Sequence, residues 1–347
     1  MVRNMAERIG MNTINLHSRP RITAFAAVGG ALEADGLLKG KLARVFDDDT
    51  IGQDSWEKAE TQLQQAAAEA ALERAGLNQN EINLHFAGDL LGQCNASTFG
   101  SRDMDIPFVG LYGACSTMAL SIATAAMAVE SGAAHTALAS TSSHFCAAEK
   151  QFRHPLEYGG QRPPTAQWTA TAAGSCLLQC GQQDDSVSPV ITQIHFGRVI
   201  DLGVIDANNM GAAMAPAAAD TIGSFLRDTQ SSPSDYDLIL TGDLGSVGSD
   251  LLRQLLLQDW GIDLIDRHSD CGNMLYDIEQ ENEVNAGASG CGCSAAVLCA
   301  DILPRIASGE LRRVLFAATG ALLSSVSPLQ GESIPSIAHA VLIESVN

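Results

Sequence analysis

Cys115 occupies the position in this sequence that best suits covalent chemistry. It follows Gly113 and Ala114, between a predicted strand at 106–111 and a long apolar helix. A helix N-terminus carries unpaired N–H groups and a partial positive charge, and both lower a thiol pKa toward the nucleophilic thiolate. The small flanking residues leave room for a ligand. The alternative is a structural thiol, because cysteine packs well as a small buried hydrophobe.

A thiol nucleophile needs a neighbouring base, and His339 is a candidate. It lies in a segment that we predict to be a loop before a final strand at 340–344. A loop there could reach Cys115 from the other end of the chain. A histidine on the protein surface is the alternative interpretation.

The segment 142–171 lacks clean periodicity and contains three prolines, so we predict a long functional loop. It is basic for so acidic a chain and includes His144, Lys150, Arg153, His154 and Arg162. A local positive patch would suit a small anionic ligand. Ordinary surface ion pairs are the alternative.

Cys291 and Cys293 form a Cys-Gly-Cys pair at the start of another predicted helix. This spacing differs from the usual zinc pairs, and no second pair follows, so we expect no metal site. Cys293 is the counterpart of Cys115 in an internal repeat, and we expect it to pack in the core.

The elements that would position these residues occur twice. The segment 54–75 is a predicted helix, with Asp54 and Glu57 as a capping box and Gly76 as its stop. A strand at 82–87 follows and ends in Gly-Asp-Leu. In the second half a strand at 236–240 ends in the same Gly-Asp-Leu, which contains Asp243.

A second pair of matching segments supports the duplication. Cys293 lies 178 residues after Cys115, and Gly309, which ends the second helix, lies 177 after Gly132. A near-constant offset over a whole helix is typical of an internal repeat. Pro304 should kink the second helix. Alternating strands and helices indicate largely parallel sheets covered by helices.

Composition sets the class of protein. The chain has 347 residues, of which 46% are hydrophobic and 17% charged, and its net charge is −20. Such a chain can form a large core, and its charge opposes binding to nucleic acid. We expect no secretory signal, because the N-terminus has no apolar run, and reduced thiols for the nine cysteines. The apolar segment 118–129 is too short for a membrane span, so we predict that it forms a buried helix.

Several segments together resemble the thiolase and ketoacyl-synthase superfamily and, more closely, the stage V sporulation protein AD family of endospore-forming bacteria. The similar segments span roughly residues 20 to 345 and include AGDLLGQ at 87–93, GACST at 113–117, QFRHPLEYGGQ at 151–161, MGAAMAPAAADTI at 210–222 and ESIPSIAHAV at 332–341.

The resemblance implies a fold and a role. The fold is a thiolase-like αβαβα layered sandwich made of two pseudo-twofold related halves, which we place at 1–185, with Cys115 and the loop 142–171, and at 186–347. The implied role is to bind dipicolinic acid (pyridine-2,6-dicarboxylate) and to support its movement into and out of the spore. Membrane proteins of the same sporulation complex are the implied partners, at the cytoplasmic side of the spore inner membrane, and a homodimer is expected.

The sequence departs from the enzymes of the superfamily. Those enzymes pair the cysteine with histidine and asparagine, or with two histidines, from the second half. The corresponding positions here read Thr241-Gly242-Asp243 and Gly287-Ala288-Ser289-Gly290. We therefore expect ligand binding without catalysis and no cofactor, with a calcium ion as an optional companion of the ligand. The alternative is a cysteine-dependent acyltransferase or ketoacyl synthase that uses His339 as base.

The candidate ligand-binding residues combine the pocket floor expected at the cysteine with nearby polar and positive groups. They are Cys115, Ser116, Arg153, Arg162, Arg198, Asp243 and His339.

Overall fold

The computed structural model describes residues 6–152, 162–180, 188–277 and 284–346. Ten strands form one continuous path in the order β12-β11-β14-β15-β10-β3-β9-β7-β5-β6. The first half contributes β3 (Arg21–Gly30), β5 (Leu84–Asp89), β6 (Phe108–Gly110), β7 (Thr136–Ser143) and β9 (Ala172–Gln179). The second half contributes β10 (Val190–Phe196), β11 (Leu238–Thr241), β12 (His268–Asp270), β14 (Arg313–Ala321) and β15 (Ser336–Glu344).

The two halves have the same topology. From the junction outward, the strand order is β3-β9-β7-β5-β6 in one half and β10-β15-β14-β11-β12 in the other. The two sets meet at a single pair, Val190 with Arg21. In each half, three strands are parallel and the other two antiparallel to their neighbours, so the sheets are mixed rather than largely parallel.

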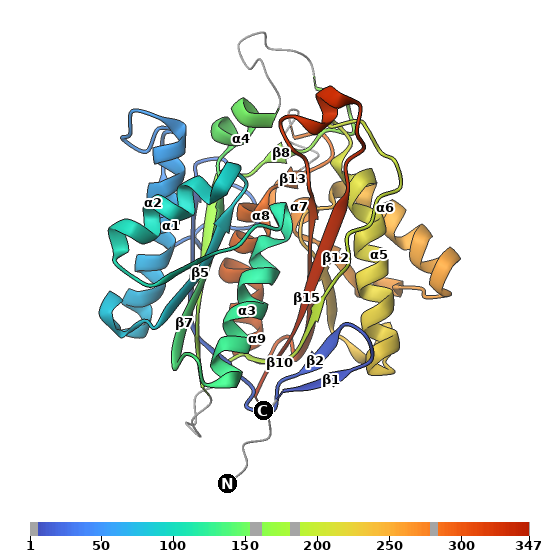
Figure 1. Cartoon of the computed structure of the whole chain (residues 1–347), viewed down its shortest axis with the longest axis horizontal. Helices are drawn as coiled ribbons and strands as arrows, with labels where there is room; N and C mark the ends of the chain where they lie inside the picture. The colour runs from blue at the N-terminus through green and yellow to red at the C-terminus, as the bar shows by residue number, and fades with distance from the viewer. Residues whose placement is uncertain (1–5, 153–161, 181–187, 278–283, 347) are drawn as a thin grey trace.

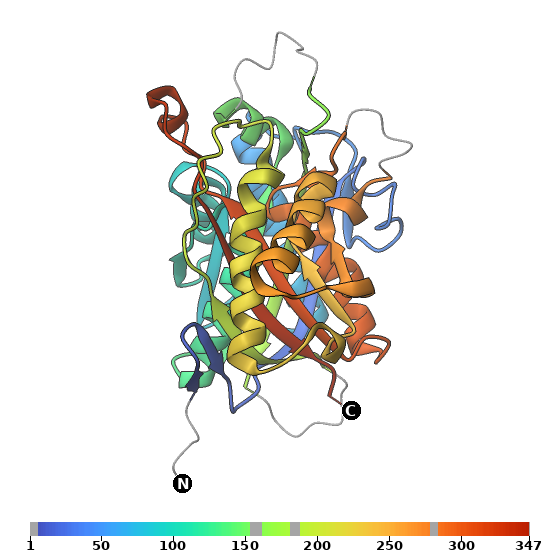
Figure 2. The ribbon, with the colours of Figure 1, turned by 90° about the vertical axis from the view of Figure 1, so that its right-hand side faces the viewer.

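Helices complete a five-layer arrangement (Figures 1 and 2). α1 (Trp56–Ala75) and α2 (Asn95–Met104) cover the outer face of the first sheet, and α5 (Met210–Thr229) and α6 (Gly245–Leu255) cover the second. Between the sheets lie α3 (Thr117–Ser131) and the segment α8–α9 (Cys291–Val297, Leu303–Ala307). The predicted layered sandwich of two related halves is confirmed.

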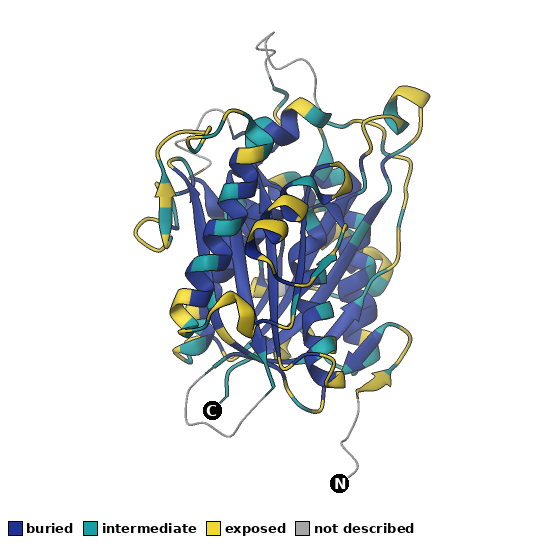
Figure 3. Ribbon diagram, turned by 60° about the vertical axis from the view of Figure 1, so that its left-hand side comes forward, coloured by how far each residue is buried: buried dark blue, intermediate teal, exposed yellow. Residues whose placement is uncertain are grey.

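The central helices are apolar and mostly buried (Figure 3). Small side chains on α3 and α8 allow close packing between the two sheets. Pro304 does not simply kink its helix: a π-helical turn at Leu298–Ile302 precedes it, and Pro304 stands at the start of α9. Proline lacks the N–H of a regular helical bond, and the wider turn accommodates that loss.

One stretch in the described part of the chain, Ala114–Ser131, has the length and composition of a membrane span, and 67% of it is buried in the fold. The expectation that the apolar segment 118–129 forms a buried helix is therefore confirmed.

Two local predictions were wrong. Ser55, rather than Asp54, caps α1 by accepting a bond from Lys58 N–H, and Asp54 instead forms an ion pair with the Lys58 side chain. The final strand begins at Ser336, four residues earlier than predicted, because this segment pairs with both β14 and β10. His339 is therefore a strand residue and not part of a loop.

The remaining elements connect the layers or extend the sheets. They are β1 (Glu7–Ile9), β2 (Thr13–Asn15), β4 (Arg44–Phe46), α4 (Phe145–Phe152), β8 (Trp168–Thr169), α7 (Cys271–Leu275) and β13 (Ala288–Ser289). β2 pairs with β10, so the N-terminal hairpin is attached to the sheet of the second half. The expected boundary at 185/186 lies outside the described residues.

Candidate functional site

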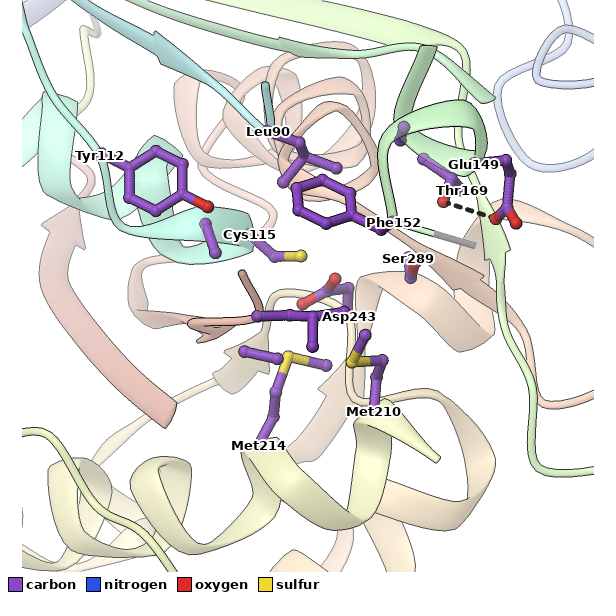
Figure 4. A pocket seen from close by; sticks show the side chains of 14 residues that line it. Leu90, Tyr112, Cys115, Glu149, Phe152, Thr169, Met210, Met214, Asp243 and Ser289 are labelled. Atoms are coloured by element: carbon purple, nitrogen blue, oxygen red, sulfur yellow. Dashed lines mark hydrogen bonds between the residues drawn. The ribbon is translucent and has the colours of Figure 1, made fainter. Parts of the chain in front are cut away.

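A pocket opens where the two halves meet at the start of α3, and Cys115 lies at its floor (Figure 4). The cavity has a volume of about 510 Å³ including its open mouth. Its lining comes from elements far apart in sequence: Leu90, Tyr112, Ala114, Cys115, Ala148, Glu149, Phe152, Thr169, Met210, Met214, Asp243, Ser289, Ala321 and Leu323. Most of these side chains are apolar, so the walls favour a flat hydrophobic ligand body.

The turn before α3 presents Cys115 to the pocket. Ala114 has a φ of 49°, a left-handed conformation that is uncommon for a residue other than glycine. β14 of the second half packs tightly against this turn. A Cβ atom on Gly320 would lie 2.2 Å from the Gly113 carbonyl oxygen. The cysteine turn and β14 of the second half therefore fit together only with glycine at position 320.

Asp243 faces Cys115 across the pocket floor. The Cys115 side chain points toward the Asp243 carboxylate (Figure 4), and the negative charge of Asp243 acts on the thiol. Asp243 accepts hydrogen bonds from Gly290 N–H at 2.7 Å and from the Thr319 hydroxyl at 3.1 Å. These two donors hold the carboxylate in position beside the thiol.

Both groups have perturbed pKa values. Burial raises the pKa of Asp243 to about 7, and its hydrogen bonds limit the rise. Burial, together with the negative charge of Asp243, raises the pKa of Cys115 well above its usual value. The expectation of a thiolate at a helix N-terminus is therefore wrong: the carboxylate and the buried position outweigh the helix dipole.

The segment around α4 builds one side of the pocket. Glu149 lines the cavity, and the Arg162 guanidinium bonds to its carboxylate at 3.0 Å and to the Gln167 carbonyl at 3.1 Å. The guanidinium also lies over the rings of Phe145 and Trp168, which stack on each other. Arg162, which does not line the cavity, thus neutralises the charge of Glu149, which does. The rings of Phe145 and Trp168 hold the guanidinium in place.

The other candidate residues lie in different places. The hydroxyl of Ser116 turns away from the pocket and donates to the Gly113 carbonyl at 2.6 Å. Arg198 is exposed and forms an ion pair with Asp220. Neither residue lines the pocket, and Arg153 lies outside the described residues. In the described part of the lining, the charged side chains are Asp243 and Glu149, both acidic.

His339 is buried in β15 and packs edge-on against Phe196. Its Nδ1 has no hydrogen-bond partner among the residues that the structure describes, and burial lowers its pKa to about 4. It is not among the residues that line the pocket. The structure therefore does not bring His339 together with Cys115 as a base.

The second cysteine pair is packed in the core. Cys291 Sγ donates to the Ser142 carbonyl at 2.9 Å, and both Cys291 and Cys293 are fully buried. Among the residues described, no group of three or more cysteine, histidine or acidic side chains is arranged to hold a metal ion.

Sequence reasoning missed several pocket residues. Tyr112 immediately precedes the predicted Gly-Ala-Cys-Ser turn, and Met210 and Met214 lie four residues apart on α5. The position of Tyr112 next to the turn, and the spacing of the two methionines on one face of a helix, were the sequence signals that could have indicated these pocket residues. Glu149 and Thr169 had no such signal, since they reach the pocket only through the fold of the segment 142–171.

The fold and this site define a protein of the thiolase-like class to which the condensing enzymes belong. Similar solved structures include 3-oxoacyl-[acyl-carrier-protein] synthase III from Aquifex aeolicus, with 13% identity, a TM-score of 0.56 and coverage of 94% of this chain and 99% of that chain. Cerulenin-bound OleA from Xanthomonas campestris has 13% identity, a TM-score of 0.57 and coverage of 94% and 96%. At these identities the likeness shows the fold alone.

The sequence matches are more specific. The profile of the stage V sporulation protein AD family matches residues 10–344. Stage V sporulation protein AD of Bacillus subtilis (strain 168) is 43% identical over 323 residues, which cover 93% of this chain and 94% of that protein. The chain belongs to the stage V sporulation protein AD family, as its sequence segments suggested.

Proposed function

We propose that this chain is a sporulation protein that binds dipicolinic acid in the Cys115 pocket without turning it over. The observation that carries the proposal is Asp243, which stands against Cys115 where condensing enzymes need a histidine. The charge of the buried carboxylate raises the thiol pKa, and the ionised carboxylate gives no donor for a developing oxyanion. A pocket in this state can hold a ligand but lacks the histidine with which condensing enzymes assist the cysteine.

The walls of the pocket support a flat ring. Leu90 and Phe152 supply apolar surface on one side of the cavity and Met214 on the other. The hydroxyl groups of Tyr112 and Ser289 can act as neutral donors to ligand carboxylates, whereas the Thr169 hydroxyl donates to Glu149 at 3.5 Å. A ring with two carboxylates fits a slot with apolar faces and polar edges.

The charge of the ligand must be matched inside an acidic site. With a pKa of about 7, Asp243 can take up a proton and then donate to a ligand carboxylate. Arg162 cancels the charge of Glu149. A calcium ion that accompanies the ligand is the second way to offset two pocket carboxylates.

The wider role follows from family membership. We propose that the protein supports movement of dipicolinic acid into and out of the spore, as a peripheral component of a membrane complex at the inner membrane. The exposed edge of the first sheet, β6, is a surface on which a second copy can add its own edge strand and form a homodimer.

Calorimetric titration with dipicolinic acid, with and without calcium, tests the binding proposal. The wild-type chain should bind with one site per chain, and Cys115→Trp, which fills the pocket floor, should abolish the heat signal. Arg198→Ala is the matched control, because this arginine lies outside the pocket, and it should bind like wild type.

Two results would overturn the proposal. Cys115→Trp binding as tightly as wild type, with an unchanged thermal unfolding profile, would place the ligand elsewhere. Acylation of Cys115 by acyl-CoA donors, detected by mass spectrometry, would instead favour the cysteine-dependent acyltransferase.

A further inference from the structure

Two loops beside the pocket mouth carry a concentration of exposed apolar side chains. The first, residues 197–209, connects β10 to α5, and the second, residues 322–335, connects β14 to β15. Isolated exposed apolar residues are normal on a protein surface, whereas clusters mark interaction sites. Five large apolar side chains on these loops are exposed, and we call them the apolar collar: Val199, Leu202, Ile205, Val326 and Leu329.

The two loops form one structural unit. Ile200 and Ser336 exchange backbone hydrogen bonds of 2.8 Å in both directions. Ile334 N–H donates to the Val204 carbonyl at 2.7 Å, and the Ser333 hydroxyl donates to Asp201 at 2.6 Å. The collar is therefore held by backbone bonds, and its apolar side chains are presented outward from an ordered base.

The collar is continuous with the pocket. Met210, which begins α5 directly after the first loop, lines the cavity, and so does Leu323 at the start of the second loop. The second loop projects beyond the sheets, as its red helical turn shows in Figures 1 and 2. Leu329 in this turn is 87% exposed, and Leu202 and Ile205 on the first loop are 66% and 69% exposed.

The charges around the collar select the kind of partner. The two loops contain Asp201, Asp206 and Glu332, and their single cation, Arg198, forms an ion pair with Asp220 on α5. An acidic rim around apolar residues repels anionic lipid headgroups and attracts a surface with the opposite charge.

We propose that the apolar collar docks a partner protein whose contact face has apolar side chains at its centre and lysine or arginine at its rim. Docked there, the partner covers the pocket mouth, so that a ligand passes between the two proteins without crossing bulk water. The docking surface does not depend on which ligand occupies the pocket.

Site-specific photocrosslinking in the full chain tests this surface. Benzoylphenylalanine is placed at Leu202, at Leu329 or at Leu257, in a sporulating Bacillus subtilis strain that lacks its own 43% identical relative. Leu257 is the matched control because it is apolar and 58% exposed but lies beyond α6. The expected result is one and the same protein crosslinked from positions 202 and 329 and absent from position 257.

The crosslinked protein is then purified and its affinity for the full chain is measured. Leu202→Asp/Leu329→Asp should weaken the complex by about tenfold or more, because charges replace apolar contacts at the interface. Leu257→Asp should leave it unchanged, and added salt should weaken the wild-type complex. Both the double variant and Leu257→Asp should keep the wild-type unfolding temperature and dipicolinic acid affinity.

Other occupants give other results, and each overturns the proposal. A second copy of the chain as the sole crosslinked product would make the collar a self-association surface. Co-sedimentation with phosphatidylglycerol vesicles that is lost in the double variant would make it a lipid-binding surface. Absence of any crosslinked protein, or equal crosslinking from position 257, would show that the collar docks no partner.

Discussion

The carboxylate of Asp243, from the second half of the chain, faces the thiol of Cys115 in the first half, and its negative charge raises the pKa of that thiol. The Gly-Asp-Leu segment that supplies Asp243 also occurs in the first half, where it supplies Asp89. Asp89 is buried and bonds to Ser97 and to Leu91 N–H. The same repeated segment thus gives a structural carboxylate in one half and a pocket carboxylate in the other.

Removal of the Asp243 charge should activate the thiol. Asp243→Asn eliminates the negative charge that raises the Cys115 pKa, so alkylation of Cys115 by chloroacetamide at pH 8 should become severalfold faster. Mass spectrometry of the Cys115 peptide measures the rate. Cys146, whose pKa burial raises to about 11, is the internal reference and should react at an unchanged rate. An unchanged rate at Cys115 would mean that burial alone controls this thiol.

Binding of dipicolinic acid should weaken as pH rises through 7. Below pH 7 Asp243 is protonated and neutral, and above pH 7 its negative charge repels the ligand dianion. Affinity should then fall by up to about tenfold per pH unit between pH 7 and pH 8, with proton uptake on binding. Calorimetry in buffers of different ionisation enthalpy measures both. Asp243→Asn should flatten the profile, and a wild-type profile already flat would contradict the assignment.

The ion pair between Arg162 and Glu149 should increase the affinity for dipicolinic acid, because it neutralises the negative charge of Glu149. Arg162→Ala removes a positive charge from beside the Glu149 carboxylate in the pocket wall, so dipicolinic acid affinity should fall on the order of tenfold or more. The double variant Arg162→Ala/Glu149→Gln removes that charge and should recover most of the affinity. If the double variant binds as weakly as the single one, Arg162 contacts the ligand directly or only supports the rings of Phe145 and Trp168.

Condensing activity should be absent. Incubation with acetyl and malonyl thioesters should release no more free thiol from the wild-type chain than from Cys115→Ala, because the histidine and asparagine partners of the condensing enzymes are replaced and the thiol pKa is raised. The expectation is wrong if wild-type turnover exceeds the background and disappears in Cys115→Ala.

Gly320 should be required for the position of the cysteine turn. In Gly320→Ala the new methyl group meets the Gly113 carbonyl, and overpacking of this kind costs on the order of 1–3 kcal/mol. Thermal unfolding should occur at lower temperature, and dipicolinic acid should bind more weakly. Gly92→Ala is the control, since its nearest neighbour is a Gln151 side-chain atom at 3.5 Å. Equal stability of the two variants would show that the turn can shift freely.

Three features could be predicted from the amino-acid sequence: the repeated architecture, the position of Cys115 at the start of a helix, and Asp243 as a candidate pocket residue. Local patterns carry this information: repeated strand ends, a constant helix offset, and Gly76 and Gly132 at helix ends. The missing histidine was visible from the resemblance to the condensing enzymes, which have a histidine after the strand where this chain reads Gly242-Asp243.

The protonation state of the Cys115 thiol and the set of residues that line the pocket depend on tertiary contacts. The thiol pKa depends on burial and on a carboxylate 128 positions away in sequence, and both outweigh the local helix terminus. Arg198 and Arg162 look alike as charges in a sequence, yet one pairs with Asp220 on the surface and the other lies behind Glu149. The prediction of His339 as a base was wrong for a related reason. Cross-strand pairing with β10 and β14 holds this residue in the sheet, and the residues next to it in sequence do not reveal pairing between distant segments.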